Sequence, residues 1–355
     1  SLMLQECISQ NVENGSNTFV TFFDTRKAFD TVWISGLLYM LYQCGIKGKL
    51  WRLLRLSYLQ CFTAVLVNGK LSPWFQLFQG VKQGAILSML LYICFINGLL
   101  IEVLDSHLGA SALGLQLGAI GYADDIAFIT VDRCNMQELI NMAYAYSCKW
   151  RFDFSPSKCA VMVFGRNTPA APFDMGGDML KVVNEYVHVG IKLVSKGPFP
   201  LIDIKKKIQA CKRSFYSIIG TSLSKTTLSP IALSTLYWSI AVPKFLSGVE
   251  ARCFDDNEVT EYSKFHKNMA KEIQQLPSNT PDPVVFSMLG WKDVATYIEY
   301  MKIVFVHRIL SYSPTSVYRV LFIRRLYYLC LKGIQYSSSP IARIIEALMK
   351  YDLLS

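Results

Sequence analysis

Short runs of β-branched and aromatic residues that lead to aspartates constrain the fold of this chain most. Residues 18–23 read TFVTFF and are followed directly by Asp24. Residues 119–122 and 126–130 are also largely apolar, and Ala123, Asp124 and Asp125 join them. Such runs are typical of short strands, and so short a connection predicts an antiparallel hairpin with a tight turn. The sequence therefore predicts a sheet that carries carboxylates at its strand ends.

The pattern up to about residue 164 predicts helices between these strands. Apolar residues recur at helical spacing from Ile34, in residues 50–59 and in residues 135–150. Asn68 and Gly69 tolerate positive φ and predict a β-hairpin between two apolar runs, and residues 160–164 predict a further strand. This order indicates an α+β domain, with helices packed on one face of an antiparallel sheet and the other face free for a substrate.

The pattern changes from about residue 198 onward. Residues 202–223 and 232–248 predict long helices with little strand signal between them, so we expect a mainly helical second part. One face of the first helix is basic and carries Lys205, Lys206, Lys207, Lys212 and Arg213. Such a face suits a polyanion, although a solvated helix surface has the same composition.

A membrane protein is the alternative that the composition leaves open. Apolar residues make up 52% of the chain, and residues 85–101 approach spanning length. This run contains Ser88, Asn97 and Gly98, lacks a flanking Lys or Arg in its last turn, and has no second run to pack against. We therefore expect a buried core helix and no membrane, which recovery of the protein without detergent would test.

The net charge indicates which kind of partner the chain could bind, and the cysteine pattern indicates the redox state of its compartment. Lys and Arg total 36 against 26 Asp and Glu, an excess that suits a polyanionic partner or an anionic membrane surface. The ten cysteines include no C-x-x-C pair, so neither a zinc site nor a disulfide framework is indicated. A reducing compartment is the better expectation.

The three aspartates predict a metal site if they converge. Carboxylates held close together repel one another and raise their own pKa values unless a cation neutralises them. Mg²⁺ prefers oxygen ligands and commonly keeps phosphate oxygens and water in its shell. Two such ions about 4 Å apart can support an in-line displacement at phosphorus. The alternative is a simple acidic turn, because Asp is a favoured turn residue.

Five segments carry a resemblance to a known family. They read FFDTRKAFD at residues 22–30, GVKQGAILS at 80–88, YADD at 122–125, FSPSKCAVMVF at 154–164 and EYVHVG at 185–190. Together they resemble the motifs of reverse transcriptases, most closely those of non-LTR, LINE-like retrotransposons. Residues 242–250 and 289–291 are more loosely similar to segments that follow the palm in such proteins.

The resemblance implies an RNA-directed DNA polymerase that extends a DNA primer on an RNA template with dNTPs and two Mg²⁺ ions, or Mn²⁺ in their place. Asp24 and Asp124 would be catalytic ligands of both metals, and Asp125 a neighbouring ligand. Lys158 would assist the departure of pyrophosphate, although a solvated surface lysine is an alternative reading of that position.

The resemblance also implies a set of substrate-binding residues. Phe29 would block a ribose 2′-OH by steric exclusion, although a core aromatic is the alternative. Gln83 and Gly84 would contact the incoming nucleotide and the template, and Tyr122 belongs to the tetrapeptide that carries the acidic pair. Met89 and Ser155 depart from the family's usual residues, which are Pro and Asn at those places.

The resemblance divides the chain into a palm at residues 1–197, a helical thumb at 198–250 and a helical C-terminal region at 251–355. Only 23 residues precede Asp24, so the fingers are expected to be largely missing and the isolated chain to polymerise poorly. The alternative is a catalytically inactive palm-like module that binds RNA. Retrotransposon proteins of this kind are expected in the cytoplasm and nucleus, within a ribonucleoprotein.

Overall fold

A computed structural model of the chain describes residues 1–82, 84–165, 171–195, 204–222, 228–251, 256–337 and 339–353. The chain divides into two compact units. One comprises residues 7–190, and the other comprises Ser1–Glu6 together with Ile191–Ser355. Helix α1 (Leu2–Glu13) therefore begins in one unit and ends in the other.

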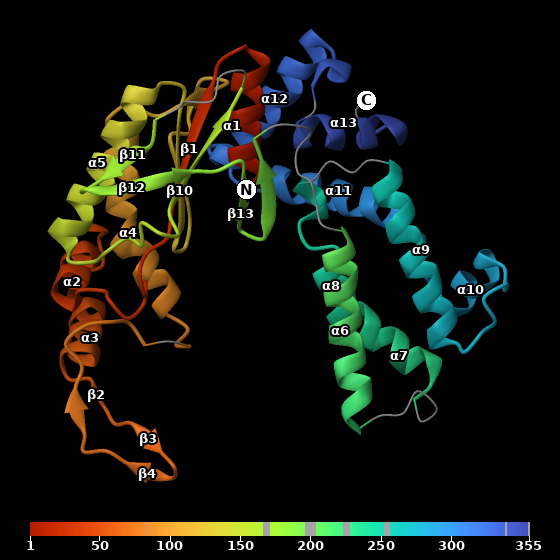
Figure 1. Cartoon of the computed structure of the whole chain (residues 1–355), viewed down its shortest axis with the longest axis horizontal. Helices are drawn as coiled ribbons and strands as arrows, with labels where there is room; N and C mark the ends of the chain where they lie inside the picture. The colour runs from red at the N-terminus through yellow and green to blue at the C-terminus, as the bar shows by residue number, and fades with distance from the viewer. Residues whose placement is uncertain are drawn as a thin grey trace. The chain divides into compact units, whose positions relative to one another are not determined.

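A six-stranded sheet forms the centre of the unit of residues 7–190 (Figure 1). Its strand order is β11-β12-β10-β1-β9-β8. The central strand pairs antiparallel with β9 and β10, whereas β10 pairs parallel with β12, so the sheet is mixed. The strands are β1 (Thr18–Phe23), β8 (Ala119–Tyr122), β9 (Asp125–Thr130), β10 (Ala160–Phe164), β11 (Phe173–Met175) and β12 (Asp178–Val182).

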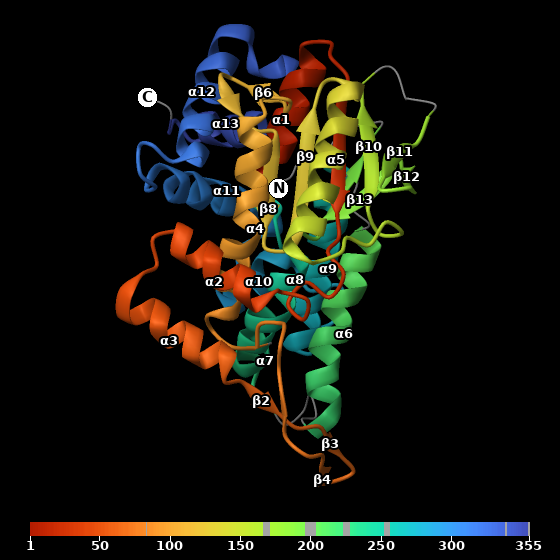
Figure 2. The same cartoon turned by 90° about the vertical axis from the view of Figure 1, so that its left-hand side faces the viewer.

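Helices α4 (Ser88–Asp105) and α5 (Arg133–Trp150) pack on one face of this sheet, and α2 (Ile34–Gln43) packs on α4 and extends the same core. Helix α5 packs on β1 and β9, while α4 packs on α2, α5 and β8, as Figure 2 shows from the side. Phe23 and Phe128 from the strands meet Phe95 of α4 and Ile140 of α5 in one buried cluster. The predicted α+β class with helices on one face is confirmed.

Helix α4 corresponds to the apolar run that raised the membrane alternative. Among the described helices it is long and apolar enough to cross a membrane, a test that core helices of soluble proteins also pass. Leu91, Phe95, Leu99 and Val103 on this helix are buried in the core. The face of α4 that carries these four residues is part of the core, as predicted for this helix.

The second face of the sheet differs from the prediction. Side chains that point away from α4 and α5 are buried, with exposed fractions of 0% for Val20 and Ile129 and 1% for Phe22. Tyr186 of β13 (Glu185–His188) stacks on the Phe22 ring, with centroids 4.1 Å apart. The prediction of a sheet face free for substrate is wrong at these positions, because alternating strand residues are apolar on both faces.

A long hairpin follows helix α3 (Gly48–Leu59) in the same unit. Its strands are β2 (Phe62–Thr63), β3 (Leu66–Val67), β4 (Lys70–Leu71) and β5 (Phe75–Gln76). Asn68 and Gly69 form the turn with φ of +48° and +77°, as predicted from that dipeptide. A smaller hairpin, β6 (Ser111–Ala112) and β7 (Leu115–Gln116), precedes β8.

The unit that contains residues 191–355 is mainly helical, as predicted. Beyond β14 (Ile191–Val194) its longer helices are α6 (Ile204–Ser222), α9 (Asp256–Ile273), α11 (Val294–Leu310), α12 (Val317–Lys332) and α13 (Pro340–Lys350). Shorter ones are α7 (Pro230–Leu236), α8 (Val242–Phe245) and α10 (Asp282–Leu289), with a π-helical turn at Tyr237–Ala241 and 3₁₀ turns at Val249–Ala251 and Ile334–Tyr336. The unit boundary falls at 190/191, and the division into palm, thumb and C-terminal region stays a prediction.

Candidate active site

Strand register brings the three predicted aspartates to one edge of the sheet. Phe23, the last residue of β1, pairs with Ile126 of β9, so continuing this antiparallel register sets the next residue, Asp24, opposite Asp125. Tyr122 pairs with Asp125 across the β8–β9 hairpin, which leaves Ala123 and Asp124 as the two turn residues. The hairpin turn predicted from the sequence is confirmed, with Asp125 as the first residue of β9 rather than part of the turn.

The turn that presents Asp124 has a specific backbone requirement. Ala123 has φ of +58°, a left-handed conformation that an alanine adopts at a cost of roughly 1–2 kcal/mol. A two-residue hairpin loop needs such a residue because its twist must match that of the flanking strands. The hairpin pairing therefore holds Asp124 at the end of the sheet, where its carboxylate is exposed.

The carboxylates lie in one negative field. Burial raises the pKa of Asp125, and the charges of Asp124 and Asp24 raise it further. The pKa of Tyr186 is raised to about 12, mainly by burial, with Asp125 and Asp24 among the contributing charges. A negative field that disfavours the ionised form of Asp125 favours a bound cation.

The side chains do not form a ready-made metal cage. Within the described residues, no group of three or more His, Cys, Asp or Glu side chains is arranged to hold an ion. Mg²⁺ is commonly bound by one or two carboxylates together with water and substrate phosphates, so an all-protein cage is not required. Asp24 and Asp124 fit that donor chemistry.

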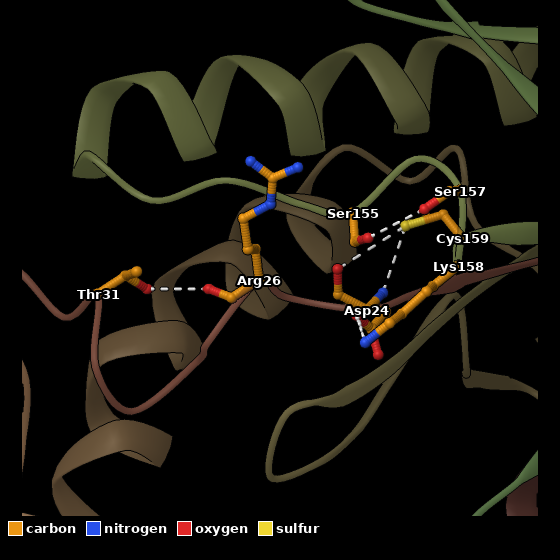
Figure 3. A network of polar contacts seen from close by, with 7 residues as sticks. All are labelled: Asp24, Arg26, Thr31, Ser155, Ser157, Lys158 and Cys159. Carbon is orange, nitrogen blue, oxygen red and sulfur yellow. Dashed lines mark hydrogen bonds and ion pairs between the residues drawn. The ribbon is translucent and has the colours of Figure 1, made fainter.

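Lys158 and Cys159, which directly precede β10, contact Asp24 (Figure 3). Lys158 Nζ lies 3.4 Å from Asp24 Oδ2. The backbone N–H of Asp24 donates to Cys159 Sγ at 3.3 Å, and the backbone N–H of Ser155 donates to Asp24 O at 2.8 Å. Burial raises the pKa of the Cys159 thiol to about 11, so it stays protonated at neutral pH. These contacts fix the backbone of Asp24 and leave its carboxylate paired with Lys158.

Cys159 is a positioning residue that sequence reasoning missed. It directly follows Lys158, and β10 pairs with β1 in a register that sets Ala160 opposite Phe22. Continuing that register sets Cys159 opposite Phe23, from where its Sγ reaches the backbone N–H of Asp24. The contact depends on β10 being the neighbour of β1, which no local sequence pattern indicates. Ser155, which departs from the family pattern, contacts Asp24 through its backbone N–H, so this contact does not depend on the side chain.

Phe29 contacts the Gly-rich loop of residues 80–84. Two of the motifs with predicted substrate-binding residues therefore lie next to each other. The Phe29 ring is half-buried, 5.2 Å from the ring centroid of Tyr92, and the Phe29 backbone oxygen accepts a hydrogen bond from Val81 N at 2.7 Å. Gly80 has φ of +89°, and a Cβ there would lie 2.9 Å from Asp30 O. The loop is thus packed directly against the segment that follows Asp24.

The other predicted substrate residues lie nearby or outside the described part. Gln83 lies outside the described residues, and Gly84 is exposed with φ of +78°. Tyr122 is 65% exposed and borders an apolar pocket of about 280 Å³. Its other lining residues are Met89, Ile93, Ile96, Leu100, Gly121 and Ala123. The structure brings Asp24, Asp124, Asp125 and Lys158 together, and their roles stay predictions.

Comparison with known proteins agrees with this arrangement. Residues 2–209 match the family described as reverse transcriptase (RNA-dependent DNA polymerase). The match covers more than half of the chain, and the chain belongs to the reverse transcriptase family.

Its relatives specify the kind of reverse transcriptase. The chain is 24% identical over 300 residues to the Pol polyprotein of the type-1 retrotransposable element R2 of Popillia japonica, covering 79% of this chain and 48% of that protein. It is 28% identical over 182 residues to the RNA-directed DNA polymerase of the mobile element jockey of Drosophila funebris, covering 48% of this chain and 19% of that protein. The predicted resemblance to non-LTR, LINE-like reverse transcriptases is confirmed.

The chain spans about half or less of the length of the curated relatives it matches. Among solved structures, the apo telomerase of Candida tropicalis is similar with a TM-score of 0.46 and 12% identity, over 96% of this chain and 50% of that one.

Proposed function

We propose that this chain carries the polymerising centre of an RNA-directed DNA polymerase, which extends a DNA primer on an RNA template with dNTPs. The observation that carries the proposal is the strand register that sets Asp24 opposite Asp125 and presents Asp124 at the adjoining turn. Membership of the reverse transcriptase family supports the same reaction class.

Each residue has a defined part in the proposal. Asp24 and Asp124 would hold two Mg²⁺ ions, or Mn²⁺, with Asp125 beside them; bound there, the ions would supply charge neutralisation at the reacting phosphate. Phe29 would exclude a ribose 2′-OH, and Gln83 and Gly84 would position the nucleotide and template. These last roles rest on the family motifs.

Lys158 would act on the carboxylates and on the leaving group in turn. Its ammonium pairs with Asp24 at 3.4 Å, and both side chains are solvent-accessible, so the pair can open at little cost. Once released from Asp24, the ammonium would be close enough to the strand end to neutralise a departing pyrophosphate. A lysine can supply either a charge or a proton there.

Asp124→Asn tests the proposal, with Asp178→Asn as a matched control on an exposed acid of β12 in the same unit. We expect Asp124→Asn to weaken Mn²⁺ binding, measured by electron paramagnetic resonance, and to abolish any RNA-templated primer extension. Asp178→Asn should leave both unchanged. Unaltered Mn²⁺ affinity in Asp124→Asn would contradict the metal site.

A palm-like module that binds RNA without polymerising is the second candidate. It is compatible with Met89 and Ser155, which stand where the family usually has Pro and Asn. This candidate predicts RNA binding that is indifferent to Mn²⁺ and to Asp124→Asn, with no primer extension under any condition. The enzyme proposal predicts the opposite metal dependence.

We also propose that the chain acts in the cytoplasm and nucleus within a ribonucleoprotein, and not at a membrane. Nine cysteines in the described part are free thiols, and several of them are buried, which suits a reducing compartment. Imaging of a tagged chain together with its co-purified RNA tests this. Retention of the tagged chain in a membrane fraction would contradict it.

A further inference from the structure

Two cysteines that are far apart in the sequence meet where helix α2 packs on α4, a contact between helices that Figure 2 shows. Cys44 directly follows α2 and caps its C-terminal end, and its side chain is exposed. Cys94 lies within α4 and is half-buried against the core. Both are free thiols, and both belong to the unit of residues 7–190.

A glycine lets the two helices approach closely at this contact. A Cβ atom on Gly98 of α4 would lie 2.5 Å from Cε of Met40 in α2, so the approach depends on the missing side chain. Cys94 lies one helical turn before Gly98, on the same face of α4. Cys44 N donates to Met40 O at 2.9 Å, which continues the helix by one turn beyond Met40. Both cysteines therefore lie one turn from the point of closest approach.

The two thiols also interact directly. Burial raises the pKa of Cys94, and the Cys44 thiol raises it further as a charge and as a hydrogen-bond partner. Tyr146, whose hydroxyl lies beside Gly98, has a pKa that is raised mainly by burial, with the charges of Glu102 and Cys44 adding to it. Thiols in contact are close enough for the small side-chain rotation that forms a disulfide.

We propose that Cys44 and Cys94 form a reversible thiol–disulfide site, which a low-molecular-weight disulfide such as oxidised glutathione converts into a cross-link between α2 and α4. Cys44 is exposed and meets the oxidant first. Its thiolate attacks one sulfur of glutathione disulfide, which forms a mixed disulfide at Cys44 and releases one glutathione thiolate.

The Cys94 thiolate completes the exchange. It attacks Cys44 Sγ, the bond between Cys44 and glutathione breaks, and the second glutathione thiolate leaves. The two protons that the protein thiols lose are taken up by the two glutathione thiolates. The protein dithiol is thereby oxidised to a disulfide, and glutathione disulfide is reduced to two thiols.

Two other roles for these cysteines are less well matched. A buried free cysteine ordinarily packs as a small hydrophobic residue, which suits Cys94 but not the exposed Cys44. A structural zinc site needs four ligands, and no cluster of three or more His, Cys, Asp or Glu side chains that could hold an ion occurs in the described ranges.

The cross-link closes a loop of about 50 residues, which runs through α3, the β2–β5 hairpin and the Gly-rich loop. It restricts the unfolded chain and so stabilises the unit of residues 7–190. In a reducing compartment the thiols stay reduced, and the cross-link forms when the chain meets oxidising conditions. This property goes beyond the proposed polymerase function, because neither cysteine belongs to the carboxylate centre.

The test incubates the folded full chain with oxidised glutathione at about pH 8.5, where thiolates are abundant. The remaining thiols are blocked with iodoacetamide, and the fragments are mapped by mass spectrometry. We expect Cys44 linked to Cys94 with the loss of two hydrogen atoms, and dithiothreitol should reverse the link. In Cys94→Ser, Cys44 should keep glutathione as a mixed disulfide, because no second thiol displaces it.

Two further variants complete the mapping. Cys44→Ser changes an exposed side chain, should give no cross-link at Cys94, and keeps the test valid if Cys94→Ser fails to fold. Cys134→Ser is the matched control, since it removes an exposed cysteine from α5 of the same unit, and the link between Cys44 and Cys94 should still form.

Stability provides the second measurement. Oxidation should raise the urea midpoint of the unmodified chain by about 1 M, as expected for a loop of this length, and should not change that of Cys44→Ser. Asp124→Asn should form the cross-link as the unmodified chain does, so this proposal and the polymerase proposal can fail separately.

Three results would overturn the proposal. Recovery of Cys44 only as a mixed disulfide in the unmodified chain would show that Cys94 does not reach it. Links from Cys44 to Cys134 or Cys148 as frequent as those to Cys94 would show unselective oxidation. An unchanged or lower urea midpoint in the cross-linked chain would show that the native packing of α2 on α4 does not accommodate the bond.

Discussion

Lys158 Nζ lies 3.4 Å from Asp24 Oδ2, and Asp24 also donates its backbone N–H to the thiol of the next residue, Cys159. Two consecutive residues of one segment therefore hold Asp24 by its charge and by its backbone. The hydrogen bond from its N–H fixes the backbone of Asp24, and the ion pair with Lys158 occupies one of the two carboxylate oxygens. A metal that binds Asp24 through Oδ2 must compete with this ammonium.

Lys158→Gln is expected to tighten Mn²⁺ binding while slowing any primer extension. An exposed ion pair contributes at most about 1 kcal/mol. Its loss should therefore increase the Mn²⁺ affinity of Asp24 by no more than roughly fivefold. Isothermal titration calorimetry with Mn²⁺ measures the metal affinity. Lys181→Gln, which removes an exposed lysine from β12, is the control. Weaker metal binding in Lys158→Gln would show that the lysine supports the site rather than competing for it.

Gly80→Ala is expected to destabilise the unit of residues 7–190 more than Gly84→Ala does. Both glycines have positive φ, so each alanine costs about 1–2 kcal/mol in backbone strain. Only at Gly80 does a Cβ also meet backbone, at 2.9 Å from Asp30 O, whereas nothing lies within 4 Å at Gly84. Urea unfolding should therefore give a lower midpoint for Gly80→Ala, and equal midpoints would contradict the packing of this loop against Asp30.

Arg325→Met is expected to destabilise the unit that contains residues 191–355 strongly. Arg325 and Glu6 are 0% and 1% exposed, their Nε and Oε2 atoms lie 3.0 Å apart, and Glu6 Oε1 accepts a hydrogen bond from Ile341 N at 2.7 Å. Removing one partner leaves a buried charge and costs about 3–5 kcal/mol.

The double variant Glu6→Gln with Arg325→Met provides the control for this pair. It removes both charges, and Gln can still accept from Ile341 N, so part of the lost stability should return. The free energy of unfolding from urea titration measures all three proteins. A double variant less stable than Arg325→Met would show that the cost lies in packing rather than in the unpaired charge.

Stability is expected to fall below pH 6.5 because His266 is buried and neutral. Burial lowers its pKa from 6.5 to about 4; Tyr237 Oη lies 3.0 Å from Nδ1, and Nε2 lies 3.2 Å from the carbonyl oxygen of Lys292. Since a carbonyl only accepts, Nε2 carries the proton and Nδ1 accepts from Tyr237.

The sign of this effect follows from the unfolded state, which binds a proton near pH 6.5 while the folded state does not until about pH 4. The contribution is thus intact above pH 6.5 and is lost progressively as the pH falls toward 4, by about 2 kcal/mol at pH 5. Urea unfolding at pH 7.5 and pH 5 should show this loss in the unmodified chain and a smaller one in His266→Gln. An equal loss of stability in the unmodified chain and in His266→Gln would show that groups other than His266 cause the pH dependence.

Much of the local structure could be predicted because short-range rules govern it. Residues 18–23 form a strand with the predicted bounds, residues 119–130 form the predicted hairpin, and Asn68-Gly69 forms the predicted turn. Strands β11 and β12, which extend the sheet beyond β10, were not predicted. They are short, and Asp178 and Lys181 in β12 break up its apolar residues, so their pairing depends on β10 being in place.

The sequence by itself determined the chemistry of the site: three aspartates at strand ends and motifs that identify the reverse transcriptase family. These are readable because periodicity and motif spacing are local properties of the chain. Only the tertiary structure decided that β1 lies between β9 and β10, which sets Asp24 opposite Asp125 and beside Lys158 and Cys159. Strand order and the burial of both sheet faces depend on contacts between residues far apart in sequence, and no local pattern encodes which distant strand becomes the neighbour.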